Sequence, residues 1–412
     1  MKQKMESLHK YISNFRLTDN THSTSTVIED KILNGHKIRY YINEFWTSRQ
    51  RQASSLHEVS YRACFKPRLP AFFIDLLTER GDVVYDPFSG RGTTALQAVL
   101  MGRTAYANDI NPLSRILAEP RMNPPELKDV ENRLSHIPFN KKIKSDLDLS
   151  MFYHSATLCE ILSLREYLLE RKVEGVEDTI DSWIRMVATN RLSGHSPGFF
   201  SVYTLPPNQA VSPAGQLKIN QKRRQKPEYR DIKKLILRKS AQLLKRLTDT
   251  ERENLRLYGK ASRFHTMDAR KTRDIPDDSV RLTVTSPPFL NIVNYSGDNW
   301  LRCWFNGIDD QVVAKKITMS RTLEDWEKVM GDVFHELYRI TQPGGRIAFE
   351  VGEVRKGMIQ LEEYIIPLGM KAGFSCFGVL INDQKFTKTS NIWGINNNSG
   401  GTNTNRIVVF YK

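Results

Sequence analysis

The sequence lacks several features that define large classes of protein. Its four cysteines lie far apart and form no CxxC or Cys/His spacing, which argues against a disulfide framework and a zinc site. No run reaches the roughly 18–20 apolar residues of a transmembrane helix, and no HExxH or Asp-rich metal motif occurs. The first residues lead into no apolar signal core. These absences predict a protein of the reducing cytoplasm, with no membrane partner and no metal.

Acidic residues are also in short supply: 46 Asp and Glu stand against 61 Lys and Arg, for a net charge of +15. Residues 218–246 hold twelve of the basic side chains and two acids, so two-thirds of the excess lies in one stretch. A solvated helix face is the common interpretation of a charge run, but this concentration favours a nucleic-acid contact. The candidate phosphate contacts are Lys222, Arg223, Arg224 and Lys226.

The chain of 412 residues is long enough for two or three domain-sized units. We expect a polar, irregular N-terminal extension over residues 1–45 and the first part of an α/β domain over 46–120. Residues 121–260 show helical periodicity and carry the basic run, so they are expected to form a helical insertion. The α/β pattern resumes over residues 261–412 and completes the first domain.

A glycine turn organises the α/β pattern. A β-rich run over residues 82–86 leads into Gly90 and Gly92, then into a helical pattern and a second strand over 103–109. Strand, helix and strand in about 30 residues predict a βαβ unit and a parallel sheet. Such a turn presents bare backbone N–H groups to a ligand. Alone it is weak evidence, since many such turns are only structural.

Acidic residues end two of the predicted strands. Asp109 closes the second strand, where doubly wound folds place a ribose-binding carboxylate; a helix N-cap before Pro112 is the alternative. Asp268 closes a later strand-like run that begins at residue 263. The remaining pattern predicts strands over 281–285 and 346–350, helices over 323–340 and 362–372, and a closing strand pair over 374–381 and 406–411.

The stretch Asp86–Thr94 resembles the DPFxGxGTT motif of amino-directed DNA methyltransferases. The resemblance implies a Rossmann-like, S-adenosylmethionine-dependent methyltransferase fold with a closing antiparallel strand pair, interrupted by the helical basic insertion. It also implies that S-adenosylmethionine is the cofactor, with Asp109 on its ribose hydroxyls and Asp268 on its adenine amino group. The full set of implied cofactor contacts is Lys66, Asp86, Phe88, Gly90, Gly92, Asp109, Asp268 and Thr285. A doubly wound dehydrogenase shares the glycine turn, but neither the leading DPF nor the trailing GTT is expected in it.

Thr285-Ser286-Pro287-Pro288-Phe289 follows a predicted strand and resembles the catalytic motif of the same family, in the serine form typical of cytosine N4 enzymes. An exocyclic amino group is a poor nucleophile because its lone pair is delocalised into the ring. Acceptors at the Ser286 side chain and the Pro287 carbonyl favour a pyramidal nitrogen, and two prolines fix those acceptors in place. Phe289 is expected to stack on the base once it leaves the duplex. A proline-rich turn without chemistry is the alternative for this motif taken alone.

The sequence therefore predicts a site-specific enzyme that methylates N4 of cytosine in duplex DNA. Methylation of adenine N6, an RNA substrate, and a non-catalytic nucleic-acid-binding protein remain open alternatives. Arg191 is a further candidate DNA contact, in a loop over residues 190–205 that either reaches bases or covers the cofactor. The resemblance places such proteins in restriction-modification systems of bacterial or archaeal cells, near the nucleoid and sometimes with a cognate restriction endonuclease.

Overall fold

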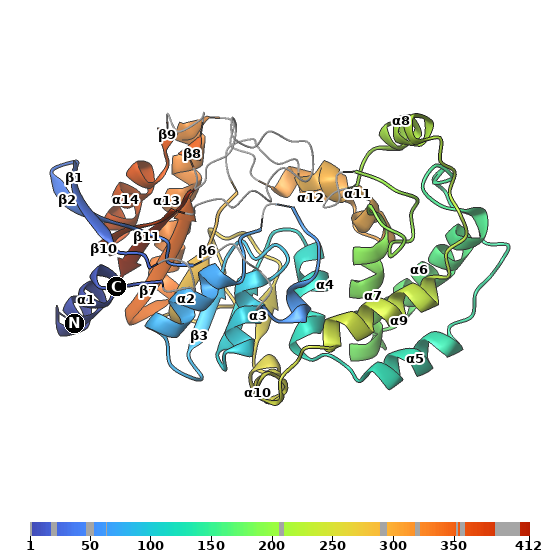
Figure 1. Cartoon of the computed structure of the whole chain (residues 1–412), viewed down its shortest axis with the longest axis horizontal. Helices are drawn as coiled ribbons and strands as arrows, with labels where there is room; N and C mark the ends of the chain where they lie inside the picture. Colours follow the sequence, from blue (N-terminus) through green and yellow to red (C-terminus); the bar gives the residue numbers. More distant parts are fainter. Residues whose placement is uncertain are drawn as a thin grey trace.

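The structure is a computed structural model, shown in Figure 1. It describes residues 2–17, 23–46, 53–62, 64–205, 210–288, 295–317, 322–351, 353–354, 359–383 and 404–412. The molecule is elongated in this view: strands gather in one half, which we call the sheet part, and helices fill the other half, which we call the helical part.

A nine-stranded sheet runs in the order β1-β2-β10-β11-β7-β6-β3-β4-β5. The strands are β1 (Val27–Leu33), β2 (His36–Asn43), β3 (Val83–Asp86), β4 (Thr104–Asn108), β5 (Arg263–His265), β6 (Val280–Thr285), β7 (Thr341–Val351), β10 (Ser375–Asp383) and β11 (Thr404–Tyr411). From β5 to β7 every neighbouring pair is parallel. β11 is antiparallel to both β7 and β10, so the expected closing antiparallel pair is present.

The N-terminal residues form regular structure, so the expectation of an irregular extension over 1–45 was wrong. They form α1 (Lys2–Ser13) and the antiparallel hairpin of β1 and β2. β2 then pairs with β10 in parallel and extends the sheet. Asn34 and Gly35 both have positive φ, as a tight hairpin turn requires. This Asn-Gly pair, with Ile32 before it and Ile38 after it, was the available signal.

Two apolar clusters cover the two faces of the sheet. One includes Leu96, Val284 and Phe73, and it joins α2 (Arg68–Leu77) and α3 (Thr93–Leu100) to the sheet. The other includes Phe334 and Phe349 and packs α13 (Leu323–Ile340) and α14 (Glu362–Lys371) on the sheet. In β7, Ile347 and Phe349 enter the second cluster and Ala348 between them enters the first, because successive residues of a strand point to opposite faces.

The helical part is built from the expected insertion and from one segment outside it. Its helices are α5 (Leu127–His136), α6 (Ser155–Val173), α7 (Thr179–Arg191), α8 (Pro213–Arg223), α9 (Ile232–Leu244), α11 (Tyr295–Phe305) and α12 (Asp310–Lys316). Figure 1 shows α11 next to α7, although α11 follows the Ser-Pro-Pro motif in sequence. The Asn306 amide donates to Thr189 Oγ1 at 2.9 Å, which ties this later segment to α7.

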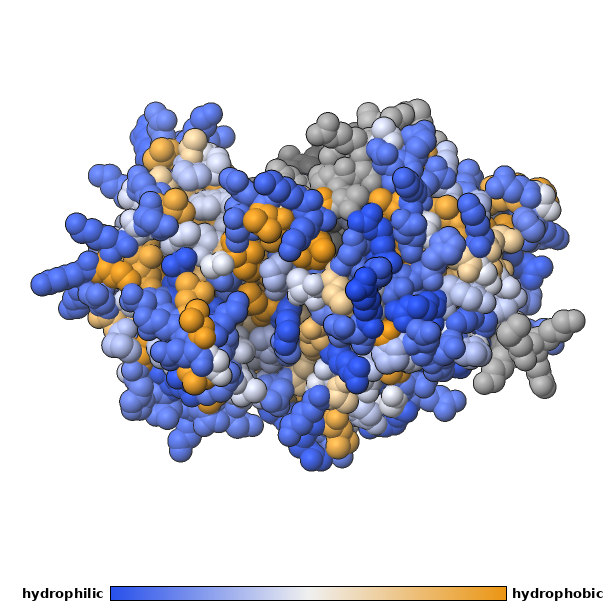
Figure 2. All heavy atoms as spheres, turned by 180° about the vertical axis from the view of Figure 1, so that it is seen from behind, coloured by the Kyte–Doolittle hydropathy of each residue, from blue (hydrophilic) through white to orange (hydrophobic). Residues whose placement is uncertain are grey.

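Short elements connect the two parts. They are α4 (Leu113–Ala118), α10 (Asp249–Asn254), the 3₁₀ turns η2 (Ser55–His57) and η3 (Glu119–Met122), and the π-helix Leu255–Gly259. A separate two-stranded ladder of β8 (Glu353–Val354) with β9 (Ile359–Gln360) lies in the sheet part, between β7 and α14 in sequence. In the part of the chain that the structure describes, no helix is long and apolar enough to cross a membrane. Figure 2 shows the reverse face of the molecule as mainly hydrophilic, with apolar patches separated by polar side chains.

The Asp181 carboxylate stabilises the helical part from inside. It is fully buried, accepts from Arg171 Nε at 2.5 Å and contacts Arg133, while Tyr167 donates to it at 3.2 Å. Asp178 caps the start of α7 in a capping box with the same Asp181. A buried carboxylate needs such partners, because an unpaired charge in the interior is costly.

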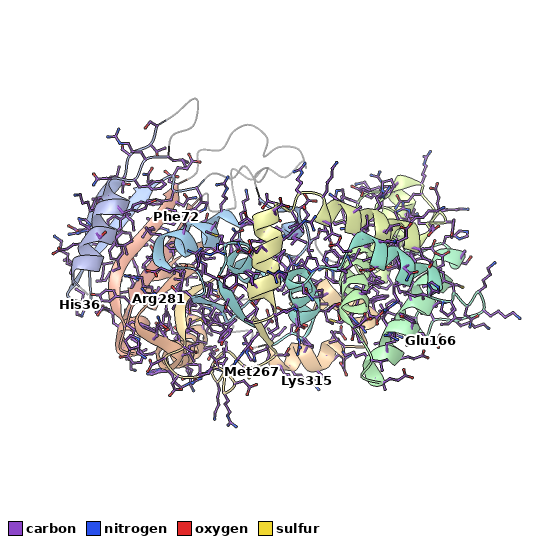
Figure 3. All side chains as sticks on the ribbon, turned by 90° about the horizontal axis from the view of Figure 1, so that it is seen from below. His36, Phe72, Glu166, Met267, Arg281 and Lys315 are labelled. Carbon is purple, nitrogen blue, oxygen red and sulfur yellow. The ribbon has the colours of Figure 1, made fainter. Side chains whose placement is uncertain are left out.

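The strand order, the parallel run and the antiparallel closing pair confirm the predicted fold class. It is a Rossmann-like α/β fold with a helical insertion between β4 and β5. In such sheets ligands bind outside the carboxyl ends of the parallel strands. In Figure 3, the view from below, Arg281 lies in the sheet part and Glu166 in the helical part, and Met267, just after β5, lies between them in this projection.

Candidate active site

The glycine turn lies at the carboxyl end of β3 and is held by Asp109. The Asp109 carboxylate accepts from the Gly90 amide at 2.8 Å and from the Asn111 amide at 2.9 Å. Burial raises the pKa of Asp109 to about 6, and these two amides oppose the shift. The structure does not support the alternative of an Asp109 N-cap, because the first amide of α4 bonds to Asn111 instead. Asp109 therefore stands where β4 ends, beside the turn.

Gly92 begins α3 in a conformation that only glycine adopts easily. Its φ is +75°, and a Cβ built there would lie 2.5 Å from the Cβ of Ala118. The neighbouring Arg121 is fully buried and donates to the backbone oxygens of Leu117, Leu56 and Arg91, which fixes the turn from behind. A larger residue at Gly92 would have to move this packed layer.

Two hydrogen bonds join the glycine turn to the Ser-Pro-Pro motif across almost 200 residues. Thr285 donates to Asp86 Oδ1 at 2.7 Å, and Thr94 donates to the Val284 carbonyl at 3.0 Å. All four residues are buried. Burial raises the pKa of Asp86 to about 7, and the bond from Thr285 opposes that shift. Asp86 and Thr285 were predicted to hold a cofactor; in this structure they hold the two strand ends in register.

Ser286 leads to a residue that sequence reasoning missed. Glu350 lies on β7, next to β6 in the sheet, and its carboxylate is hydrogen-bonded by the Ser286 side chain and by the Asn405 amide. It is 7% exposed, and burial raises its pKa to about 7. The available signal was an acidic residue at the end of the predicted strand 346–350. Asp109 and Asp268 stand in the same position, at the ends of their own predicted strands.

The two prolines of the motif lie against α13. The Pro288 carbonyl accepts from Trp326 Nε1 at 3.0 Å. The Trp326 ring is buried in the apolar cluster that contains Phe334 and Phe349. Pro287 is buried and Ser286 is partly exposed. Phe289 lies outside the described residues, so its predicted stacking role stays a prediction. In the described part of the motif, the backbone is thus held by the Trp326 hydrogen bond, and the Ser286 side chain is partly accessible to solvent.

Asp268 lies beside the same edge but in a different environment. Asn108, at the end of β4, bonds both the amide and the carbonyl of Met267 at 2.9 Å, which fixes the chain next to Asp268. Arg270 Nη2 donates to Asp268 Oδ2 at 2.6 Å, and this hydrogen-bonded pairing lowers the pKa of Asp268. Phe88 is partly buried and packs against the apolar cluster that contains Phe334 and Phe349. An adenine contact by Asp268 remains a prediction.

The predicted DNA contacts fall into two groups. Lys222, Arg223, Arg224 and Lys226 are exposed at and after the C-terminal end of α8, with Arg223 stacked 3.8 Å from the centre of the Tyr203 ring. Arg191 is only 9% exposed and lies under the Phe199 ring. The described residues of the 190–205 loop are packed in the helical part: Phe199 and Phe200 are buried, and Arg230 holds the Phe199 carbonyl.

Lys66, the remaining cofactor candidate, lines a cavity that we describe below. Partial burial lowers the pKa of its ammonium group. Among the described residues, no group of three or more His, Cys, Asp or Glu side chains is arranged to hold a metal ion.

Comparison with known proteins connects the first part of the chain to DNA methylases. Residues 2–116 match the family model described as DNA methylase. Over 128 residues the chain is 26% identical to the type II methyltransferase M.MvaI of Kocuria varians, covering 30% of this chain and 25% of that protein. It is 27% identical over 107 residues to the type II methyltransferase M.MjaII of Methanocaldococcus jannaschii, covering 26% and 20%.

A solved structure of a proposed DNA modification methylase from Thermus thermophilus, complexed with S-adenosyl-L-methionine, is 24% identical. It covers 35% of this chain and 51% of that chain, with a TM-score of 0.22. The chain thus spans about a quarter or less of the length of the curated relatives it matches. The family match includes the glycine turn and Asp109 but ends before Ser286.

Proposed function

We propose that this protein is a DNA methyltransferase that uses S-adenosylmethionine. One observation carries the proposal: the glycine turn and the Ser-Pro-Pro motif, far apart in sequence, are joined by the Thr285–Asp86 and Thr94–Val284 hydrogen bonds. A methyl donor on the first and an acceptor on the second would therefore meet at one sheet edge. The DNA methylase match of residues 2–116 supports the same activity.

The residues at the turn fit the proposed cofactor. The turn leads directly into the N-terminus of α3, where backbone amides lack intrahelical partners, and the Asp109 carboxylate can exchange its amide partners for ribose hydroxyls. S-adenosylmethionine would supply an electrophilic methyl group on a sulfonium. The chain's own contribution is to hold this group rigidly, and the packed layer behind Gly92 provides that rigidity.

Ser286 and Glu350 supply the acceptor side of the reaction. The amino nitrogen of the base forms a bond to the methyl carbon while the carbon–sulfur bond breaks, and its electron pair goes to sulfur. The nitrogen then carries one proton too many. Ser286 can accept a hydrogen bond from that N–H, and Glu350, with a pKa of about 7, can take the proton through the serine hydroxyl. The Pro287 carbonyl is a second acceptor for the amino group.

Within this activity we propose that the target is N4 of a cytosine in duplex DNA. Ser286 supports it, because the serine form of the motif is typical of cytosine N4 enzymes. The test is incubation with duplex DNA and labelled donor, followed by digestion and mass spectrometry of the nucleosides. N4-methylcytosine is expected, with Ser286→Ala as the inactive control. N6-methyladenine in its place would overturn the base assignment but keep the enzyme class.

The same assay includes structured RNA as an alternative acceptor. Transfer to duplex DNA and not to RNA is expected, and transfer to RNA alone would overturn the proposed substrate. Absence of transfer to either, with protein that binds both DNA and the donor, would favour a non-catalytic nucleic-acid-binding protein. Sequencing of the modified DNA would give the recognition site. The type II relatives support a role in a restriction-modification system. The test is whether methylation of DNA by this protein blocks digestion of that DNA by a nuclease encoded beside it.

A further inference from the structure

A second polar site lies outside the sheet edge. A cavity of about 750 Å³ opens between residues 53–67 and α9, and we call it the basic cavity. Its charged lining side chains are Lys66, Arg91, Arg191, Arg238, Lys239, Arg246 and Glu58. Six of these seven are basic. Pockets of a few hundred to a thousand cubic ångströms suit ligands the size of a nucleotide.

One face of α9 and the residues just beyond its end supply half of the basic side chains. Arg238, Lys239 and Gln242 recur at helical spacing and continue to Arg246 just beyond the helix. Because residues three and four apart share a helix face, these groups point together into the same space. Lys234 and Lys245 lie elsewhere on this segment and do not line the cavity. The basic run noted in the sequence is therefore divided between the cavity and solvent.

The charges in the basic cavity are only partly neutralised by the chain. Lys239 is 6% exposed and has one carboxylate within reach, Glu58 at 3.6 Å. Arg191 is 9% exposed; it bonds to Asn190 and lies 4.0 Å from the centre of the Phe199 ring, and it forms no ion pair with a described residue. Burial, with Arg302 and Arg238 nearby, lowers the pKa of Arg191 to about 10. Buried cations that repel one another favour an anionic ligand.

The cavity also adjoins the candidate active site. Arg91 belongs to the glycine turn, and it donates to the Val59 carbonyl at 2.8 Å, which fixes residues 53–62 against the turn. Tyr61 lines the cavity and lies 3.4 Å from the position of a Cβ on Gly90. A polymer seated in the cavity would thus pass next to the sheet edge where the base is proposed to react.

We propose that the basic cavity binds the phosphodiester backbone of the DNA substrate, with phosphate oxygens on Arg238, Lys239 and Arg246. Guanidinium groups bind phosphate through paired N–H donors, and the lysine adds a point charge. This assignment rests on the proposed function for the identity of the polymer. It differs from a general attraction to the basic run, because it requires the cavity-facing residues and not their neighbours on the same segment.

The test compares two double variants that remove equal charge. Arg238→Gln/Arg246→Gln removes two positive charges that line the cavity, whereas Lys234→Gln/Lys245→Gln removes two positive charges outside it. Equilibrium DNA binding is measured without donor over a range of salt concentrations. The cavity variant is expected to bind at least about tenfold more weakly, with a salt slope smaller by about two, since each phosphate contact contributes roughly 0.9. The control variant should keep the wild-type slope.

Three results would overturn the proposal. One is an unchanged salt slope in the cavity variant, and another is an equal loss in both variants, which would mean bulk charge alone. The third is stabilisation of the wild type by inorganic phosphate at constant ionic strength, lost in the cavity variant while DNA binding is unaffected. Because binding is measured without methyl transfer, wild-type DNA binding without turnover would instead count against the proposed enzyme and leave the cavity assignment standing.

Discussion

Two places in the molecule hold desolvated groups of opposite charge. At the carboxyl edge of the sheet, Asp86, Asp109 and Glu350 are carboxyl groups whose pKa values burial raises to about 7, 6 and 7. In the basic cavity the groups are cations: burial lowers the pKa of Lys239 to about 8, and Arg191 shifts in the same direction. Both sets of groups are desolvated, and opposite charges of the chain neutralise neither set fully.

The contrast with fully paired charges is instructive. Asp181 is just as buried but has two arginines and a tyrosine around it, and it serves the packing of α6 and α7. Incompletely neutralised groups cost stability, so their concentration at one sheet edge and in one cavity points to ligands. The carboxylates suit hydroxyl and amino donors, whereas the cations suit phosphate. The predictions below test this division, beginning with the largest effect.

Ser286→Ala should lower methyl transfer by roughly 10²- to 10⁴-fold, because it removes both the acceptor and the link to Glu350. Donor binding, measured by calorimetry, should change little. Ser279→Ala serves as a control, since Ser279 is a partly exposed serine whose hydroxyl donates to the Pro276 carbonyl away from the site. A Ser286→Ala enzyme with near wild-type turnover would contradict the proposed role.

Glu350 should set the acid limb of the pH–rate profile. Its pKa is raised to about 7, so the ionised acceptor forms as pH rises, and turnover should climb through pH 7 and then level off. Glu350→Gln should lose about 10²-fold in rate and also lose this limb. A Glu350→Gln profile that kept the limb would assign it to another group.

The same raised pKa values predict the pH dependence of stability. A carboxyl whose folded pKa lies above its unfolded value stabilises the fold fully below the unfolded pKa and loses that contribution as pH rises through the folded one. For Asp86, Asp109 and Glu350 the window runs from about pH 4 to pH 7. The melting temperature of the unliganded protein should therefore fall across this window. Asp86→Asn should flatten the fall, and an unaltered slope would rule Asp86 out as its source.

Asp181→Asn should lower the free energy of unfolding by about 3 kcal/mol, because Arg133 and Arg171 lose their shared partner. Urea titration measures the change. The hydrogen bonds at the sheet edge lie outside this network, so donor affinity below the unfolding transition should be retained. Lost donor affinity in the folded variant would show that the two halves are more tightly coupled than their hydrogen bonds indicate.

Gly92→Ala should cost about 1–3 kcal/mol of stability, since the new Cβ meets Ala118 at 2.5 Å and φ is positive. Gly81→Ala is the matched control: its φ is also positive, at +86°, but no atom lies within 4 Å of its Cβ. The difference between the two melting temperatures isolates the steric part. Equal losses would mean that backbone conformation alone governs both positions.

The smallest effect is expected at Asp268. Its carboxylate is 42% exposed and paired with Arg270, so Asp268→Asn should change stability by less than about 1 kcal/mol. Asp109→Asn should weaken donor binding about tenfold, as expected for the loss of a charged acceptor. If Asp268→Asn weakens donor binding as much, the adenine contact predicted from the resemblance gains support. An unchanged affinity would reduce Asp268 to a surface ion pair.

The sequence by itself determined the local elements around the site. Gly90, Gly92 and the strand before them predicted a βαβ unit, and the two-proline motif stood after a strand as expected, because turn chemistry and strand patterns depend on near neighbours. Secondary structure further along, from α13 to β11, was also predicted close to its observed bounds. The N-terminal hairpin was missed although its Asn-Gly turn was visible.

Only the tertiary structure decided which side chains meet. Glu350 beside Ser286, Thr285 on Asp86, and Arg191 turned inward toward Lys239 all depend on strand order and helix packing between distant segments. Burial also sets the pKa values that separate the anionic edge from the cationic cavity, because desolvation exists only once the chain is folded. Sequence therefore indicated the chemistry of each piece, while the fold fixed which pieces can act together.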